Sequence, residues 1–403
     1  AIGSTALGAD TLGSRSVAIG ANSLNTQNFT TATNVYNVAV GYDAGTAITT
    51  GIFNSLHGAL AGSSLTDADR NTAVGMNALG SDTLGSKSTA VGQSALFAQN
   101  FTTATDSHNT AVGYNAGVTV TTGRYNTVLG SLAGDALTDG DWNVALGVNA
   151  LTTDTSGCTS VAIGSNSLQV QNFTSATDTY NVAVGYNAGV VVTTATGNTL
   201  LGGLAGDAIT TGQDNVCVGY LAGTYQADVT TGNGNVLIGP YTKPADGTDN
   251  YAHGLGYNLS CAGDYTTLGQ GTSDIRAAHG NITWATVSDQ RYKKDIVNST
   301  AGLSFINDLT PRTFKYKNLG ELPETFNAYE ANSTKVFKNS NTNHGFIAQE
   351  VKAAIDAHSE LKDGFKLWGE RPDGGQEIGE AALIPILVKA IQELTARIAT
   401  LEG

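Results

Sequence analysis

The chain has 403 residues, a net charge of −14 and 50 glycines, and only 13% of its residues are charged. So much glycine without a Gly-X-Y period excludes both an ordinary helical enzyme and a collagen. The acidic balance argues against a nucleic-acid partner, which requires clustered Lys and Arg. No run of 18 apolar residues occurs, so we expect no membrane insertion. Three widely spaced cysteines predict neither a disulfide framework nor a metal site, and no cofactor is expected.

The composition changes along the chain. Proline first occurs at Pro240 and glutamate at Glu321, and most Lys and Arg residues follow position 280. A long segment that avoids good helix formers is followed by one with the mixture of an ordinary α+β domain. We therefore predict a repetitive all-β shaft over 1–239, a neck over 240–287 and a small α+β domain over 288–403.

A short motif that ends in glycine recurs throughout the first part. Its spacings run 17, 21, 17 and 17 residues, which makes a larger repeat of 72 residues. A fixed period of this size predicts stacked units, each of which contacts mainly its neighbours. The motif glycines are Gly3, Gly20, Gly41, Gly58, Gly75, Gly92, Gly113, Gly130, Gly147, Gly164, Gly185, Gly202, Gly219 and Gly239.

Each unit contains one predicted strand. The residues three and one before the glycine are mostly apolar or β-branched, as Val38 and Val40 are, and a small residue such as Ala39 stands between them. This alternation predicts that the outer pair shares one face, and we expect each rung to bury that pair. An asparagine four before the glycine predicts a hydrogen-bonded ladder along the stack. One unit differs, because Ser55 and His57 occupy the outer positions.

A single rung cannot stand alone. Two medium apolar side chains contribute roughly 1.5–3 kcal/mol each, whereas ordering a backbone residue costs about 1–2 kcal/mol. The rungs therefore need neighbouring rungs, and we also expect neighbouring chains. The motif Ser-Val-Ala-Ile-Gly at 16–20 and 160–164 resembles the β-roll head repeats of bacterial trimeric autotransporter adhesins and the shafts of bacteriophage tail fibres. Both are homotrimers, so the resemblance implies a trimeric β-roll or β-helix.

The tail carries four motifs, at 284–294, 313–316, 344–351 and 387–394. Together they resemble the endosialidase-type intramolecular chaperone at the C-terminus of phage tailspikes and tail fibres. In that family the domain assembles a trimer and then cuts itself off before the serine of a Ser-Asp motif. The resemblance implies a single self-cleavage between Val287 and Ser288, with no external substrate.

The resemblance also implies roles for the residues around the bond. Ser288 is the nucleophile, Lys293 its base, and Asp289 and Arg291 complete the cleavage motif; His344 either supports cleavage or holds the fold. A hydroxyl beside the preceding carbonyl is already at high effective concentration for an acyl shift. A lysine acts as base only if burial or neighbouring cations lower its pKa. The alternative interpretation is that Ser288 caps a turn within a solvated basic segment.

The end of the chain predicts a coiled-coil helix. Its apolar residues follow a 3,4 spacing over nearly three heptads. An Ile and Leu seam of this kind favours two strands in model coiled coils, so the trimer is implied by the resemblance rather than by the seam. The seam residues are Ile384, Leu387, Ile391, Leu394, Ile398 and Leu401.

The 21-residue units each carry a Gln-Asn-Phe insertion, which predicts protruding loops. An aromatic ring beside amides can stack on a sugar, so we expect these loops to contact host glycan, with avidity from repeated copies. The alternative is that the rings lock neighbouring chains together. The candidate residues are Asn28, Phe29, Asn100, Phe101, Asn172 and Phe173.

These features predict a structural and host-attachment protein of a phage tail fibre, located in the virion. Its expected partners are two further copies of itself, a host cell-surface glycan or receptor, and other tail proteins. Two alternatives are a cell-surface trimeric adhesin and the distal part of a polysaccharide-depolymerising tailspike.

Overall fold

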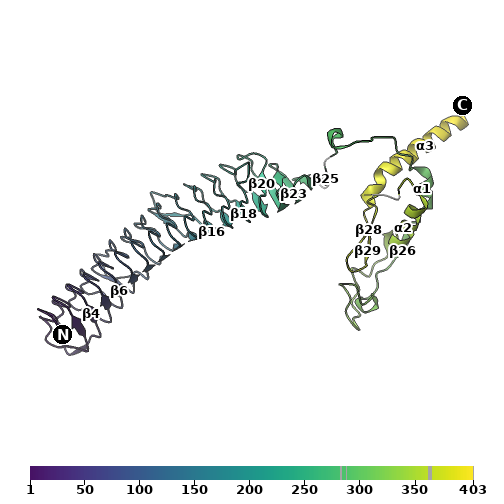
Figure 1. Ribbon diagram of the computed structural model, residues 1–403. Coiled ribbons are helices and arrows are strands. Elements are labelled where there is room, and N and C mark those ends of the chain that lie inside the picture. The colour runs from purple at the N-terminus through teal and green to yellow at the C-terminus, as the bar shows by residue number, and fades with distance from the viewer. Residues whose placement is uncertain (282–283, 287, 362–364, 403) are drawn as a thin grey trace. The chain divides into compact units, whose positions relative to one another are not determined.

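The computed structural model describes residues 1–281, 284–286, 288–361 and 365–402. The chain divides into two compact units, residues 1–288 and 289–403 (Figure 1).

The first unit is a parallel β-solenoid, so the predicted repetitive β shaft is confirmed (Figure 1). One three-residue strand per repeat pairs in register with the equivalent strand of the next repeat, as Val38 does with Ser55. The strands of this ladder are β2 (Val17–Ile19), β4 (Val38–Val40), β5 (Ser55–His57), β6 (Thr72–Val74), β8 (Thr89–Val91), β10 (Thr110–Val112), β11 (Thr127–Leu129), β12 (Val144–Leu146), β14 (Val161–Ile163), β16 (Val182–Val184), β17 (Thr199–Leu201), β18 (Val216–Val218) and β19 (Val236–Ile238).

Each 21-residue unit adds a second, two-residue strand to the solenoid. These strands form separate parallel pairs beside the main ladder. The pairs are β1 (Gly13–Ser14) with β3 (Thr33–Asn34), β7 (Gly85–Ser86) with β9 (Thr105–Asp106), and β13 (Gly157–Cys158) with β15 (Thr177–Asp178).

The ladder continues past residue 239 and then changes direction. β21 (His253–Tyr257) and β23 (Tyr265–Gln270) extend it in parallel, beside the short pair β20 (Lys243–Pro244) and β22 (Ser260–Cys261). β24 (Ser273–Ala278) then turns back antiparallel to β23, followed by β25 (Ala285–Thr286). The segment predicted as a neck therefore begins as further solenoid.

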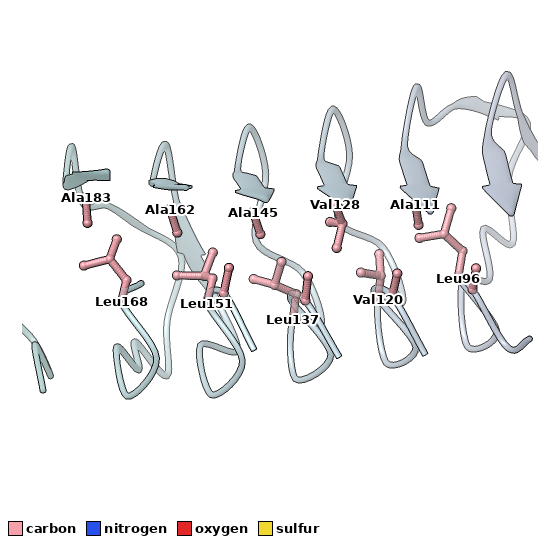
Figure 2. Packing of buried hydrophobic residues seen from close by; sticks show 14 of the residues in the cluster. Leu96, Ala111, Val120, Val128, Leu137, Ala145, Leu151, Ala162, Leu168 and Ala183 are labelled. Carbon is pink, nitrogen blue, oxygen red and sulfur yellow. The ribbon is translucent and has the colours of Figure 1, made fainter. Parts of the chain in front are cut away.

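The central residue of each strand, rather than the outer pair, faces the core. Ala39 and its equivalents are fully buried, whereas Val17 and Ile19 are 43% and 38% exposed. The expectation that each rung buries its outer pair is therefore wrong for the single chain. Figure 2 shows the small central residues facing larger ones across the narrow core, as Ala145 faces Leu137.

The motif glycines let adjacent rungs approach closely. Gly41 has a φ of +145°, and a Cβ at this position would lie 2.4 Å from the carbonyl oxygen of Gly58 in the next rung. A side chain there meets backbone that cannot move aside, so the repeat requires glycine at this position.

The predicted asparagine ladder is present inside the solenoid. The backbone N–H of Asn54 donates to Oδ1 of Asn37 (2.8 Å), and the N–H of Asn71 donates to Oδ1 of Asn54 (3.0 Å). Each amide nitrogen also donates to a backbone carbonyl, as Asn37 Nδ2 does to Gly51 (2.7 Å). The buried amides therefore satisfy backbone groups that no strand pairs.

The second unit is a small mixed α/β domain. Its helices are the 3-10 turns η1 (Gln290–Tyr292), η2 (Leu319–Glu321) and η3 (Glu380–Leu383) and the α-helices α1 (Leu303–Asp308), α2 (Ala348–Ala357) and α3 (Ile384–Glu402). Its strands form two antiparallel pairs, β26 (Arg312–Phe314) with β27 (Asn343–Gly345) and β28 (Trp368–Glu370) with β29 (Gln376–Ile378). The core gathers Phe305 from α1, Val351 and Ile355 from α2, Leu367 and Ile386.

Candidate cleavage and assembly site

The predicted cleavage motif begins the second unit as an exposed turn. Asp289 caps η1 by accepting from the backbone N–H of Arg291 (2.8 Å). The Arg291 guanidinium also donates to both Asp289 carboxylate oxygens, at 3.0 Å from Nε and 2.7 Å from Nη2. These hydrogen bonds hold the pKa of the Asp289 carboxyl below its usual range. A two-pronged ion pair within the motif thus fixes the turn that follows Ser288 in the chain.

Ser288 and Lys293 lie on either side of this turn. Ser288 is exposed and ends the first unit; Lys293 is exposed and caps the C-terminal end of η1, where its N–H donates to the carbonyl of Gln290. The predicted bond partner Val287 lies outside the described residues. Residues 289–291 and 293–296 line an open surface depression, so the predicted base faces solvent in the single chain.

His344 stands on a strand that joins two of the tail motifs. It is exposed on β27 and lies opposite Thr313 on β26. The next element, α2, is fixed to the same sheet because Arg312 donates to both carboxylate oxygens of Glu350, at 2.9 and 3.1 Å. The motifs at 313–316 and 344–351 therefore assemble one structural element around His344.

Sequence reasoning missed His358, which is nearly enclosed in the second unit. Its Nε2 lies 2.7 Å from Asp308 Oδ2 and its Nδ1 3.1 Å from Glu360 Oε1. Hydrogen bonds to these carboxylates, that to Asp308 first, raise the pKa of His358. The imidazole thus ties the end of α2 to the end of α1. Because His358 follows no motif or metal spacing, only the packing reveals it.

Helix α3 presents an apolar seam to solvent. Ile386 and Ala390 are buried in the domain core, whereas the predicted seam residues lie outside it. Leu387 and Leu394 are 42% and 43% exposed, and Ile391 is 62% exposed. An apolar row of this length on one helix is typical of a surface that a partner covers.

The Gln-Asn-Phe insertions do not present aromatic rings. Phe29, Phe101 and Phe173 are only 6–8% exposed. Their burial corrects the expectation that these rings stack on a glycan. It equally prevents them from locking onto another chain. The preceding glutamines are fully buried and bind aspartates one rung away, as Gln99 Nε2 does with Asp82 Oδ2 (2.6 Å). Each Gln-Asn-Phe triplet thus binds the neighbouring rung internally, and within the triplets only Asn28, Asn100 and Asn172 are exposed.

Comparison with known proteins gives one family match, within the C-terminal part of the chain. Residues 288–360 match the family Peptidase_S74, described as chaperone of endosialidase. The resemblance of the tail motifs to an endosialidase-type chaperone is therefore supported over this range, which begins at Ser288. No curated protein and no solved structure matched the chain. A chaperone of this family behind a β-solenoid fits a tail-fibre-like protein and indicates trimerisation and self-cleavage.

The part of the chain that the structure describes holds no cluster of three or more His, Cys, Asp or Glu side chains suited to a metal ion. None of its helices combines the length and apolar character that a bilayer crossing demands.

Proposed function

We propose that this protein is a homotrimeric phage tail fibre that attaches the virion to its host. The observation that carries the proposal is a chaperone of endosialidase domain placed directly behind a β-solenoid. The second unit guides three chains together and is then removed by one cleavage per chain, between Val287 and Ser288. Host surface glycan and other tail proteins are the further partners of the mature fibre.

The exposed face of the solenoid supports assembly from several chains. The outer strand residues form two columns, and the one directly before the motif glycine is apolar in every rung from Val74 to Ile238. In this column Leu146, Leu201 and Ile238 are 41%, 38% and 36% exposed, on strands that pair in register. An apolar row of this length exceeds the patches that monomers normally expose. Two further copies of the chain would remove it from water.

The cleavage chemistry follows from the residues at the junction. Lys293 takes the proton from Ser288 Oγ, and this oxygen attacks the carbonyl carbon of Val287. The bond from that carbon to the Ser288 amide nitrogen breaks, and the nitrogen takes up the proton from Lys293. The resulting ester is hydrolysed by water, which leaves a Val287 carboxylate and a new Ser288 N-terminus. Asp289 and Arg291 hold the turn that carries both groups, and His344 is the candidate for a supporting role.

Exposure of Lys293 supports a link between assembly and cleavage. A lysine becomes a general base when it is desolvated or lies near other cations. Lys293 is exposed in the single chain, and Lys294 follows it directly. Neighbouring chains that bury Lys293 would add desolvation to the effect of Lys294, so we expect cleavage to follow trimer formation.

Mass spectrometry of the purified protein tests this function. We expect a fragment that ends at Val287, which disappears in Ser288→Ala and in Lys293→Ala. Lys317→Ala is the matched control, because it removes an exposed lysine of the same unit that lies outside the cleavage motif. If the folded parent protein contains full-length chain and no shortened fragment, self-cleavage is contradicted.

A further inference from the structure

One column of side chains on the shaft is unexplained by the fold. It consists of the residue five positions before each motif glycine, one per rung, and is called the ring column here. Its side chains are mostly aromatic or cationic. From the N-terminal end its first ten members are Arg15, Tyr36, Phe53, Arg70, Lys87, His108, Tyr125, Trp142, Thr159 and Tyr180.

The backbone of the ring column disfavours the residues found there. All ten have φ between 51° and 67°, the left-handed region that suits glycine and asparagine. A bulky aromatic in this region is an outlier. Gly197 and Gly234 occupy later rungs of the same column, which demonstrates that the solenoid accepts glycine there. The rings are therefore retained for what their side chains contact.

Most rings of the column cover one another. Tyr36 stacks on Phe53 with 5.5 Å between ring centroids, and His108 and Trp142 stack on the two faces of Tyr125 at 5.5 and 4.0 Å. Such contacts fix the ring planes across the column. The series ends at Trp142, because the next rung holds the short side chain of Thr159.

Thr159 places a short side chain between two aromatic ones, on the rungs of Trp142 and Tyr180. Trp142 has one face on Tyr125, so its other face is turned toward the Thr159 rung. On the far side, the backbone N–H of Tyr180 donates to Thr159 Oγ1 (3.4 Å). Trp142 and Tyr180 are two rungs apart, roughly 9.6 Å, and are 56% and 62% exposed. Two stacking contacts of about 4.5 Å each fit one six-membered ring between them.

The charges beside the column favour an uncharged ligand. Within residues 1–239 the only Lys and Arg are Arg15, Arg70, Lys87 and Arg124, and all lie on the column or next to it. Three of them pair with aspartates: Arg70 with Asp69, Lys87 with Asp106 and Arg124 with Asp141. Because the three cations nearest to Trp142 are paired in this way, that part of the column does not attract a polyanion.

The same ion pairs place the column outside an apolar interface between chains. The side chains of Arg70, Lys87 and Arg124 are 56%, 36% and 44% exposed. Burying such pairs costs more than their attraction commonly returns. Acceptors for sugar hydroxyls stand close to the open interval, since Tyr180 donates to Asp178 Oδ2 (3.4 Å), and Asp141 precedes Trp142.

We propose that Trp142, Thr159 and Tyr180 form a binding site for one uncharged pyranose unit of a cell-surface polysaccharide. Trp142 and Tyr180 stack on the two faces of the sugar, Thr159 leaves room for it, and Asp178 accepts from its hydroxyls. The biological role rests on the proposed attachment function. The site itself lies within one chain, and its test is independent of self-cleavage.

Saturation-transfer NMR with methyl glucoside, galactoside and mannoside tests the site on the full chain. We expect saturable, millimolar binding of at least one of them. Trp142→Gly and Tyr180→Gly should weaken binding at least tenfold, and glycine suits their backbone, so the fold is kept. Tyr36→Gly is the matched control in the same column and should bind as the parent does. Thr159→Tyr should fill the interval and abolish binding.

Two results would overturn the site. One is the absence of saturable binding of all three pyranosides to the parent protein. The other is equal loss in Tyr36→Gly, or retained binding in Thr159→Tyr, with circular dichroism confirming the fold in each case. Cleavage at Val287, followed in the same samples, reports separately on the proposed function.

Discussion

The buried carboxylate of Asp82 accepts a 2.6 Å hydrogen bond from Nε2 of Gln99, one rung along the shaft. The same carboxylate accepts from the backbone N–H groups of Gly85 (3.0 Å) and Phe101 (3.1 Å). Asp154 and Gln171 repeat this arrangement 72 residues later, with 2.6 Å between them. The staple explains why the longer repeat units carry Gln-Asn-Phe: the glutamine and the ring point inward, and the four added residues are fixed to the neighbouring rung.

Removing this staple should destabilise the shaft strongly. Asp82→Ala leaves three buried donors without their acceptor, and one such donor costs about 1–3 kcal/mol. We expect a loss on the order of 3 kcal/mol in the free energy of unfolding, measured by denaturant titration. Asp67→Ala is the control, because Asp67 is exposed and its carboxylate accepts a surface hydrogen bond from the Thr50 hydroxyl (2.6 Å). Equal losses in the two variants would show that the staple is not specific.

A methyl group at a motif glycine should be equally damaging. In Gly41→Ala the new Cβ would meet the Gly58 carbonyl oxygen at 2.4 Å, and overpacking against fixed backbone costs about 3 kcal/mol. Gly271→Ala is the control: Gly271 also has positive φ (+54°), but no atom lies within 4 Å of the added Cβ. The melting temperature should fall much further for Gly41→Ala than for Gly271→Ala. Equal melting temperatures of the two variants would show that close contact between the rungs does not require glycine.

The repeat arithmetic predicted the strands but not which face they bury. Alternation at Val38, Ala39 and Val40 places the two valines on one side, and the larger side chains suggested that side as the core. The solenoid is too narrow for this: Leu and Ile residues from the opposite wall already fill it, so alanine fits beneath the strand (Figure 2). Only the width of the rung decides between the faces, and a period of two carries no information about width.

The second unit should lose stability as the pH rises. Hydrogen bonds to Asp308 and Glu360 raise the pKa of His358 above its ordinary value of 6.5. The stabilisation is therefore complete below pH 6.5 and is lost as the pH rises through the higher value of the folded state. The melting temperature of this unit should be lower at pH 8 than at pH 6, and Asp308→Asn should reduce this difference. A melting temperature independent of pH in the parent would contradict this role of His358.

The seam of α3 should control self-cleavage. Leu394→Asp places a charge in the exposed seam and leaves Ile386 and Ala390 in the core, so the domain should fold without assembling. We expect cleavage to fall at least tenfold, measured as the ratio of full-length to shortened chain on a denaturing gel. Gln392→Asp adds the same charge on the same helix outside the seam and should cleave normally. Normal cleavage in Leu394→Asp would separate the reaction from assembly.

The tail was easier to interpret from sequence than the insertions were. The motifs at 284–294 and 344–351 are short and follow the order expected of the family along the chain, and the family match begins at Ser288. The insertions offered an aromatic beside amides, which also describes a sugar site. Burial of Phe101 depends on Asp82, which lies 19 residues earlier in the chain, and no local pattern reveals that pairing. Rings that do face solvent lie elsewhere on the shaft, in the ring column and directly after motif glycines, as Tyr42 and Tyr114 do.

Sedimentation equilibrium of the uncleaved Ser288→Ala protein tests the central claim most directly, because three narrow solenoids with exposed apolar faces must assemble to be stable. We expect a single species of three times the 41.3 kDa chain mass, with no folded monomer on dilution. A stable, folded species of one chain mass would contradict it.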